Sequence, residues 1–214
     1  FNPRSSTHRS DDYCEGTAWQ WTWFVPHDVD GLVELMGGRD AFIGKLDSLF
    51  TADSKLEGES TSVDISGLIG QYAHGNEPSH HIAHLYNYVG QPWRTQEIVD
   101  EVLHTLYFNN PDGLSGNEDC GQMSAWYILN AMGFYQVCPG KPVYSIGRPL
   151  FNEATVHLKD GKSFKVIAHN NSRDNKYVRS IVLNGNKLET PFFTHQDIVD
   201  GGTLELTMGS EPLK

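Results

Sequence analysis

The sequence has little positive charge and no long apolar run. Its 16 Lys and Arg residues against 27 Asp and Glu residues give a formal net charge of −11 over 214 residues. Such a charge repels phosphate groups, so we expect neither a nucleic-acid partner nor an anionic membrane surface. No apolar run approaches the roughly 20 residues that a membrane-spanning helix needs. These absences favour a protein that binds a neutral ligand.

Cysteine is also scarce, with only Cys14, Cys120 and Cys138. Three cysteines cannot all pair within one chain, and none has CxxC spacing, so a zinc site made of thiolates is not indicated. Buried free thiols are the simplest interpretation. A Cys14–Cys120 disulfide stays open, because both residues flank acidic motifs.

The apolar residues up to about residue 137 recur with a helical period, which predicts about six helices. They are expected at Glu15–Phe24, Val29–Met36, a stripe from Leu35 to Phe50 broken at Gly37-Gly38, Ile82–Val89, a helix capped by Thr95 and reaching Tyr107, and Met123–Ala131. The alternation of Trp19, Trp21 and Trp23 would also suit a strand. Trp19 and Trp23 form an i, i+4 pair, however, which favours a helix.

From about Lys141 the period changes to two, which is typical of strands. Asp160-Gly161 and Asn184-Gly185 each sit between two such runs and predict two hairpins, and Leu204–Met208 predicts a last strand. Pro139-Gly140-Lys141-Pro142 is the natural boundary. The fold class is therefore mainly α with a C-terminal antiparallel β region, divided into residues 1–140 and 141–214.

Three segments place carboxylates and amides beside glycine or proline. They are Tyr13–Trp21, Gly75-Asn76-Glu77-Pro78-Ser79-His80-His81 and Gly116-Asn117-Glu118-Asp119-Cys120-Gly121-Gln122. Glycoside hydrolysis needs one carboxyl as acid and another as base or nucleophile. Glu15 lies among aromatic residues, where desolvation favours the protonated form, whereas Glu118 and Asp119 lie in a polar loop. The alternative is that these carboxylates only support nearby helices.

The same segments suggest two possible metal sites. Asn76, Glu77, Asn117, Glu118 and Asp119 carry oxygen ligands that suit calcium, although without EF-hand spacing. His80, His81 and His84 have the i, i+3 and i, i+4 spacing that zinc uses on a helix, which makes a zinc hydrolase an alternative. Metal analysis would separate the two.

Trp19 and Trp93 are candidate stacking faces for a sugar ring. Trp93 stands in Gln91-Pro92-Trp93-Arg94, with proline and polar neighbours, which favours an exposed ring. A non-catalytic carbohydrate-binding or assembly module is therefore a further alternative. Such a module would need aromatic residues but no paired carboxyls, so Glu15 together with Glu118 and Asp119 favours an enzyme.

Several motifs together resemble glycoside hydrolase family 92, the calcium-dependent exo-acting α-mannosidases. They are Glu15–Gln20, Phe24–Asp28, Gly75–His81, Tyr86-Asn87-Tyr88, Gly90–Trp93 and Gly116–Trp126, in order over most of the chain. The resemblance implies an (α/α)6 barrel, of which residues 1–140 would be the C-terminal half. It also implies hydrolysis of terminal α-linked mannose with inversion, and a Ca²⁺ ion that binds sugar hydroxyls.

Carried onto this sequence, the resemblance implies Glu15 as general acid and Asp119 as general base, assisted by Asn117 or Glu118. Glu77 becomes the calcium ligand, with Asn76 beside it. Gln20, Trp19, His80, Trp93 and Asn117 become substrate-binding residues.

The resemblance also implies partners and a location. The partners would be an α-mannose-containing glycan and the N-terminal part of a longer parent chain, which contributes to the family's site. We therefore expect the isolated chain to be inactive or nearly so. An exported protein, periplasmic or on a bacterial cell surface, is expected.

Overall fold

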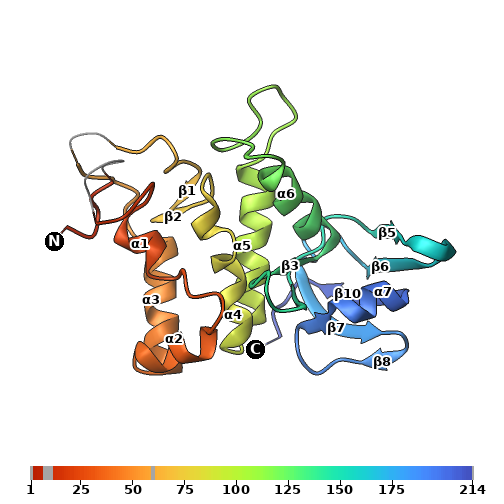
Figure 1. The fold of residues 1–214 in the computed structure, drawn as a ribbon. Coiled ribbons are helices and arrows are strands. Elements are labelled where there is room, and N and C mark those ends of the chain that lie inside the picture. Colours follow the sequence, from red (N-terminus) through yellow and green to blue (C-terminus); the bar gives the residue numbers. More distant parts are fainter. Residues whose placement is uncertain (1, 7–11, 59–60, 214) are drawn as a thin grey trace. The chain divides into compact units, whose positions relative to one another are not determined.

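The computed structural model describes residues 2–6, 12–58 and 61–213, and Figure 1 shows the order of its elements. Residue contacts divide the chain into two compact units. The first comprises residues 1–82 and 104–124, and the second comprises residues 83–103 and 125–214. The boundary expected at residues 140–141 therefore lies inside the second unit.

The first unit holds three helices, a short hairpin and a turn of 3-10 helix. These are α1 (Ala18–Trp21), α2 (Val29–Leu35), α3 (Arg39–Thr51), β1 (Leu68–Ile69), β2 (Tyr72–Ala73) and η1 (Glu77–Ser79). The Asp28 carboxylate accepts a hydrogen bond from Gly31 N (3.0 Å) and caps α2. Gly37 and Gly38, both at φ +97°, separate α2 from α3, as the sequence predicts. The β1–β2 hairpin is not predicted from the sequence.

Three details of the expected helices are wrong. Helix α1 has only four residues rather than ten, because Glu15 has a left-handed backbone and Thr17 caps the helix instead. Helix α5 (Pro92–Thr105) begins at Pro92, whose fixed φ suits a first helical turn, so Thr95 lies inside it and is buried. Leu35, placed in an apolar stripe, is exposed.

The second unit combines helices with two sheets. Its remaining elements are η2 (Ile82–His84), shared with the first unit, α4 (Leu85–Tyr88), α6 (Gln122–Met132), β3 (Phe134–Gln136), β4 (Val143–Ile146), β5 (Glu153–His157), η3 (Lys159–Gly161), β6 (Ser163–His169), β7 (Tyr177–Leu183), β8 (Asn186–Lys187), β9 (Phe192–Thr194), α7 (His195–Asp200) and β10 (Gly202–Gly209). Helices α1 to α6 match the expected count of about six. Helix α7 is not predicted from the sequence.

The five-stranded sheet has the order β5-β6-β10-β7-β8. Both predicted hairpins are present, β5 with β6 and β7 with β8. The last strand, β10, lies between them, antiparallel to β7 but parallel to β6. The β region is therefore antiparallel as expected, except for the parallel pairing of β10 with β6. Strands β3, β4 and β9 form a separate antiparallel sheet.

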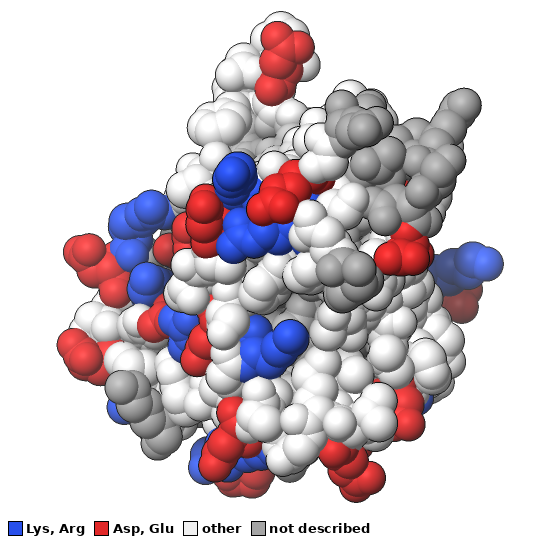
Figure 2. Space-filling model, turned by 90° about the vertical axis from the view of Figure 1, so that its left-hand side faces the viewer, with Lys and Arg blue, Asp and Glu red and all other residues white. Residues whose placement is uncertain are grey.

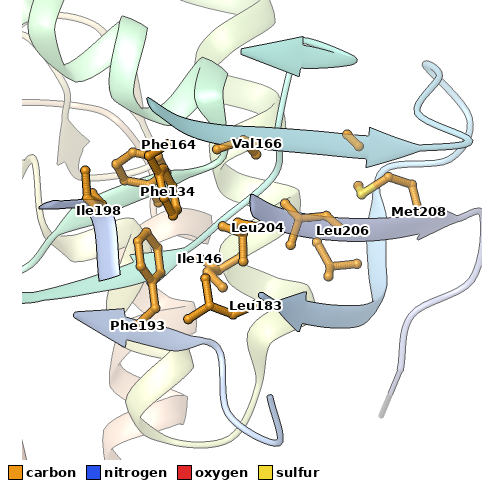
Figure 3. Close-up of a cluster of buried hydrophobic side chains, with 12 residues drawn as sticks. Phe134, Ile146, Phe164, Val166, Leu183, Phe193, Ile198, Leu204, Leu206 and Met208 are labelled. Atoms are coloured by element: carbon orange, nitrogen blue, oxygen red, sulfur yellow. The ribbon is translucent and has the colours of Figure 1, made fainter. Parts of the chain in front are cut away.

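Both sheets contribute to one apolar core, drawn in Figure 3. Phe164 of β6 stacks on Phe193 of β9 with ring centroids 5.8 Å apart. Leu204, Leu206 and Met208 alternate along β10 and are all buried, which is the period-two pattern of a strand with one covered face. The close-up shows these three side chains extending from β10 into the cluster.

Three surface properties bear on the expectations. The three cysteines are free, but Cys14 and Cys120 are exposed and Cys138 is half-buried, so the expected burial is wrong. Figure 2 shows acidic and basic side chains mixed on one face. Among the described residues, no helix is both long and apolar enough to cross a bilayer.

Candidate active site

Two of the acidic motifs meet through their glycines, within the first unit. A Cβ atom on Gly116 would lie 2.7 Å from Gly75 O, and one on Gly75 would lie 2.9 Å from Ser115 O. Real Cβ atoms do not approach backbone so closely, so only glycine allows the two segments to pack together. The glycines that frame Asn76-Glu77 and Asn117-Glu118-Asp119 thus bring these polar groups to one place.

The third motif joins them through Asn76. Its side-chain Nδ2 donates to Glu15 O (2.7 Å), and its Oδ1 accepts from Glu77 N (3.0 Å). Asn76 is buried, and both the nitrogen and the oxygen of its side-chain amide form hydrogen bonds within the protein. It therefore fixes the Glu15 backbone against the start of η1.

Three carboxyl groups gather at this junction. Burial raises the pKa of Glu77 above its ordinary range. A hydrogen bond from its own backbone N–H lowers the pKa of Glu77. The neighbouring Asp119 and the charge of Glu15 raise it further. Negative charges close to a carboxyl group disfavour its ionised form, which is why they raise the pKa of Glu77. Glu77 thus marks the place where Glu15 and Asp119 converge.

The two outer carboxylates sit on strained backbone. Glu15 has φ +53° and Asp119 has φ +47°, and Cys120 follows at φ +58°. Residues with a Cβ atom rarely adopt this left-handed conformation, which costs roughly 1–3 kcal/mol each and is found mainly at functional sites. Asp119 is exposed and Glu15 is half-buried.

A histidine clamp ties the Glu77 turn to the Asp119 turn. His80 N donates to Glu77 O (3.0 Å), and Gln122 N donates to Asp119 O (3.2 Å). The side chains of these two residues then bond each other, Gln122 Nε2 to His80 Nδ1 (3.0 Å). His80 Nε2 faces His74 O (3.0 Å), and a carbonyl only accepts, so Nε2 carries the proton. Burial lowers the pKa of His80 to about 4, which keeps it neutral.

A second chain of hydrogen bonds runs parallel to this clamp. Tyr107 O–H donates to Met123 O (3.1 Å), so its oxygen accepts from His74 Nε2 (2.7 Å). His74 Nδ1 then accepts from Tyr72 O–H (2.8 Å). Burial lowers the pKa of His74 well below its ordinary value. The start of α6, directly after the acidic loop, is thereby fixed to β2.

Four predicted site residues of this unit have other surroundings. Gln20 is buried, accepts from Thr17 N and Thr17 Oγ1, and donates to Gln71 O, so its amide holds the chain around α1. Glu118 accepts from Ser124 N (3.1 Å) and Ser124 Oγ (3.0 Å) and caps α6. Trp19 is half-buried, with Lys45 Nζ 5.6 Å from its ring centroid. Asn117 is exposed on the acidic loop.

Trp93 belongs to the second unit, whereas the carboxyl cluster belongs to the first. Its ring lines a hollow with strands β7 and β8 of its own unit. The residues around that hollow include one carboxylate, Glu189.

The histidines proposed for zinc do not converge. His81 Nε2 donates to Trp23 O (2.7 Å), and His84 lies in the second unit between Ser145 Oγ (3.0 Å) and Asn130 Oδ1 (2.8 Å). Among the described residues, no group of three His, Cys, Asp or Glu side chains is placed to hold a metal ion. The geometry thus gives these imidazoles structural hydrogen bonds.

Sequence reasoning does not identify His74, Tyr107 and Gln122 as part of the site. The bonds His74–Tyr107 and Gln122–His80 join residues more than 30 positions apart, so no local sequence pattern predicts them. The structural role of Gln20, by contrast, has a sequence signal, because Thr17-x-x-Gln20 is a capping box.

Comparison with known proteins places this arrangement in a family. The family model described as "Glycosyl hydrolase family 92 catalytic domain" matches residues 1–210. A curated relative from Arthroderma benhamiae, named an uncharacterized secreted glycosidase, is 31% identical over 210 residues, which are 97% of this chain and 25% of the relative.

Two solved structures from Bacteroides thetaiotaomicron agree. A GH92 α-mannosidase in complex with mannoimidazole is 42% identical, with a TM-score of 0.91 over 100% of this chain and 28% of its own. A GH92 inverting mannosidase is 44% identical, with a TM-score of 0.80 over 94% of this chain and 28% of its own.

The chain thus spans between a quarter and a third of the length of these relatives. The family model covers nearly all of this chain, and the similar structures share both its fold and more than 40% of its residues. The chain belongs to glycosyl hydrolase family 92.

Proposed function

We propose that this chain is the C-terminal part of the catalytic region of an exported, inverting, calcium-dependent exo-α-mannosidase. Its helical part would supply half of an (α/α)6 barrel. The observation that carries the proposal is that three separate acidic motifs meet, because Gly75 packs against Gly116 and Asn76 Nδ2 donates to Glu15 O. Membership of the family supplies the substrate class, terminal α-linked mannose.

In this proposal Glu15 is the general acid and Asp119 the general base. Asp119 suits a base because it is exposed and can reach a water molecule. Glu118 is the weaker candidate, since both of its carboxylate oxygens already accept bonds from Ser124. Inversion needs a water between the base and the sugar, so the two carboxyl groups would stand roughly 6.5–9.5 Å apart.

The residues present fit a calcium ion in part. Glu77 and Asp119 hold hard oxygen ligands in contact, and their mutual repulsion is what a divalent cation relieves. The side chain of Asn76, expected as a second ligand, is hydrogen-bonded to Glu15 O and Glu77 N. Calcium would polarise and orient the sugar hydroxyls when bound. Glu77 and Asp119 would hold it, with the remaining ligands from sugar and water.

Hydrolysis of an aryl α-mannoside by the longer protein that contains this chain tests the proposal. Glu15→Gln and Asp119→Asn should each lower kcat by about 10²–10⁴-fold, the usual contribution of one acid or base. Asp160→Asn is the matched control, because Asp160 is also an exposed carboxylate at positive φ (+62°) but lies in the second unit. NMR of the first product should show the β-anomer of mannose. Equal activity in all variants would refute the assignment.

Two further measurements separate the remaining parts of the proposal. A chelator should abolish turnover and Ca²⁺ should restore it, whereas restoration by Zn²⁺ alone would favour the zinc alternative. The isolated 214-residue chain should show little or no turnover, because the relatives are more than three times as long. Turnover by the isolated chain that Glu15→Gln abolishes would overturn this last point.

A further inference from the structure

The hollow around Trp93 is built entirely by the second unit. Trp93 is the second residue of α5, and β7 forms the surface beside it. The turn after β8 and the exposed side chain of Leu213 complete the lining. The hollow measures about 160 Å³.

The Trp93 ring is available to a ligand. It is half-buried, so one part of the ring is held by the protein while another faces outward. No described residue accepts a hydrogen bond from its indole N–H, and the nitrogen is not among the buried polar atoms. A half-exposed indole offers both an apolar face and a free donor, which is the combination that sugars use.

Hydrogen bonds hold the surroundings of the ring in place. Gln96 Oε1 accepts from Val178 N (3.1 Å) and fixes α5 to β7. Arg179 Nη1 donates to Glu211 O (2.7 Å) and Pro212 O (3.0 Å) and fixes the segment that carries Leu213. The hollow is therefore formed before any ligand arrives, which lowers the entropy that binding must overcome.

The polar groups of the hollow suit hydroxyls. Lys187 Nζ donates to both oxygens of Glu189 (3.0 and 3.2 Å), with both side chains more than half exposed. Such a pair presents donors and acceptors side by side, as two neighbouring sugar hydroxyls require. Glu189 is the only carboxylate that lines the hollow among the described residues, so hydrolysis by a carboxyl pair is not expected there.

We propose that the Trp93 hollow is a non-catalytic binding site for one neutral hexose unit of a glycan. The volume of the hollow favours a single sugar ring, because sites for larger ligands usually measure about 300–1,000 Å³. Trp93 stacks on the ring, and Lys187 with Glu189 bonds its hydroxyls. The site anchors a glycan to the second unit without cleaving it, and this goes beyond the proposed hydrolysis.

Titration of the isotope-labelled chain by NMR tests the proposal. The probes are methyl α-D-mannoside, an α-linked mannotriose and cellotriose, of which the isolated chain is expected to hydrolyse little or none. The indole N–H of Trp93 and the amides of residues 178–181 and 187–190 should shift with a saturable curve. Trp93→Ala should weaken binding at least tenfold, and Trp93→Phe less.

Phe151→Ala is the matched control, since Phe151 is also a partly exposed aromatic residue of the second unit, 40% exposed, outside the hollow. It should leave the binding curve unchanged. Lys187→Met with Glu189→Gln provides a second loss of binding if Trp93→Ala unfolds, as thermal melting would show. The absence of any saturable shift would overturn the proposal, as would shifts that persist in Trp93→Ala.

Shifts confined to the loops of Glu15, Glu77 and Asp119 would also overturn it while supporting the catalytic proposal. Saturable binding at Trp93 with no turnover by the longer protein would support the Trp93 site and contradict the proposed hydrolysis. The two proposals can thus fail separately.

Discussion

Single residues set the geometry of the carboxyl cluster. Glu15 and Asp119 stand on left-handed backbone, which relaxes unless neighbouring contacts hold it. The contacts that do so are the Gly75–Gly116 approach, the two bonds of Asn76 and the His80–Gln122 clamp. Removing one of these contacts should therefore disturb the cluster without touching a carboxylate.

Gly116→Ala should destabilise the first unit more than Gly121→Ala does. Both glycines have positive φ (+86° and +94°), so both variants lose about 1 kcal/mol of unfolding free energy to backbone strain. Only at Gly116 does the new Cβ atom meet backbone, Gly75 O at 2.7 Å, whereas at Gly121 nothing lies within 4 Å. Denaturant unfolding of both variants measures the difference. Equal losses would show that the two loops are not in contact.

The buried histidines should make stability depend on pH. Burial lowers the pKa of His80 and His81 to about 4, against about 6.5 in an unfolded chain. Between these values the unfolded state binds more protons, so stability is complete above about pH 6.5 and falls as the pH drops towards 4. Each histidine contributes a slope of up to ~1.4 kcal/mol per pH unit.

His81→Gln tests this dependence, because a glutamine amide can still donate to Trp23 O. The unfolding free energy, measured from pH 7 to pH 4, should depend less steeply on pH in this variant. The difference in slope should correspond to about one proton fewer bound on unfolding. His195→Gln is the control, since His195 is exposed, and it should leave the slope unchanged. An unchanged slope in His81→Gln would contradict the prediction.

The sequence predicts the acidic residues of the cluster better than their supports. Glu15 precedes Gly16, Glu77 precedes Pro78, and Asp119 lies between Gly116 and Gly121, so each stands in a short motif that can be recognised in the sequence. The bonds of His74, Tyr107 and Gln122 arise only when distant segments fold together, so no window of sequence contains them. Gln20 and Glu118 stay predicted site residues, and their side chains also bond to residues at helix starts, as polar side chains there often do.

At the scale of elements, local turn signals decide what the sequence can predict. Both hairpins are found because Asp160-Gly161 and Asn184-Gly185 supply the left-handed turn residues. Strands β3, β4 and β9 have three or four residues each, too few for a clear period. The parallel pairing of β10 with β6 joins segments far apart in sequence and has no local signal.

A buried ion pair joins α5 to the segment after β4. Arg148 Nε lies 3.0 Å from Asp100 Oδ1, and the side chains are 3% and 10% exposed. Arg148→Met should cost about 3–5 kcal/mol of unfolding free energy, because it removes a guanidinium group 3.0 Å from a buried carboxylate, while Arg173 Nη1 lies farther from Asp100 Oδ1, at 3.9 Å.

Lys165→Met is the matched control for that pair. Lys165 bonds Glu153 at 2.9 Å, but both side chains are well exposed, so the loss should stay below about 1 kcal/mol. Denaturant unfolding compares the two variants. Similar losses of unfolding free energy in the two variants would contradict the prediction, because the buried Arg148–Asp100 pair would then matter no more than the exposed Lys165–Glu153 pair.

At the scale of the whole molecule, neither unit is continuous in sequence. The chain builds most of the first unit, enters the second at residue 83, returns at residue 104 and leaves again at residue 124. The boundary at residue 140 is predicted from a change of period, which reports secondary structure, whereas the two units are defined by contacts between residues far apart in sequence. The division into residues 1–140 and 141–214 stays a prediction.

A single cut after Phe108 should leave the two pieces together. Phe108 is 58% exposed and begins an exposed loop, so chymotrypsin should cleave there. Each piece then carries parts of both units, which hold each other through contacts inside each unit. Size-exclusion chromatography should show the size of the whole chain in buffer and that of a half-length chain in denaturant, and Phe108→Ser should resist the cut. Separation in buffer would contradict this grouping.

The central place of β10 also affects how the chain folds during synthesis. The ribosome makes β6 and β7 well before β10, the strand that lies between them. Until β10 is made, β6 and β7 therefore each have an unpaired edge. Unpaired edges are the surfaces through which nascent chains aggregate. A ribosome that stalls before residue 202 would therefore release a chain ready to pair with its neighbours, and chaperones would be needed most at that moment.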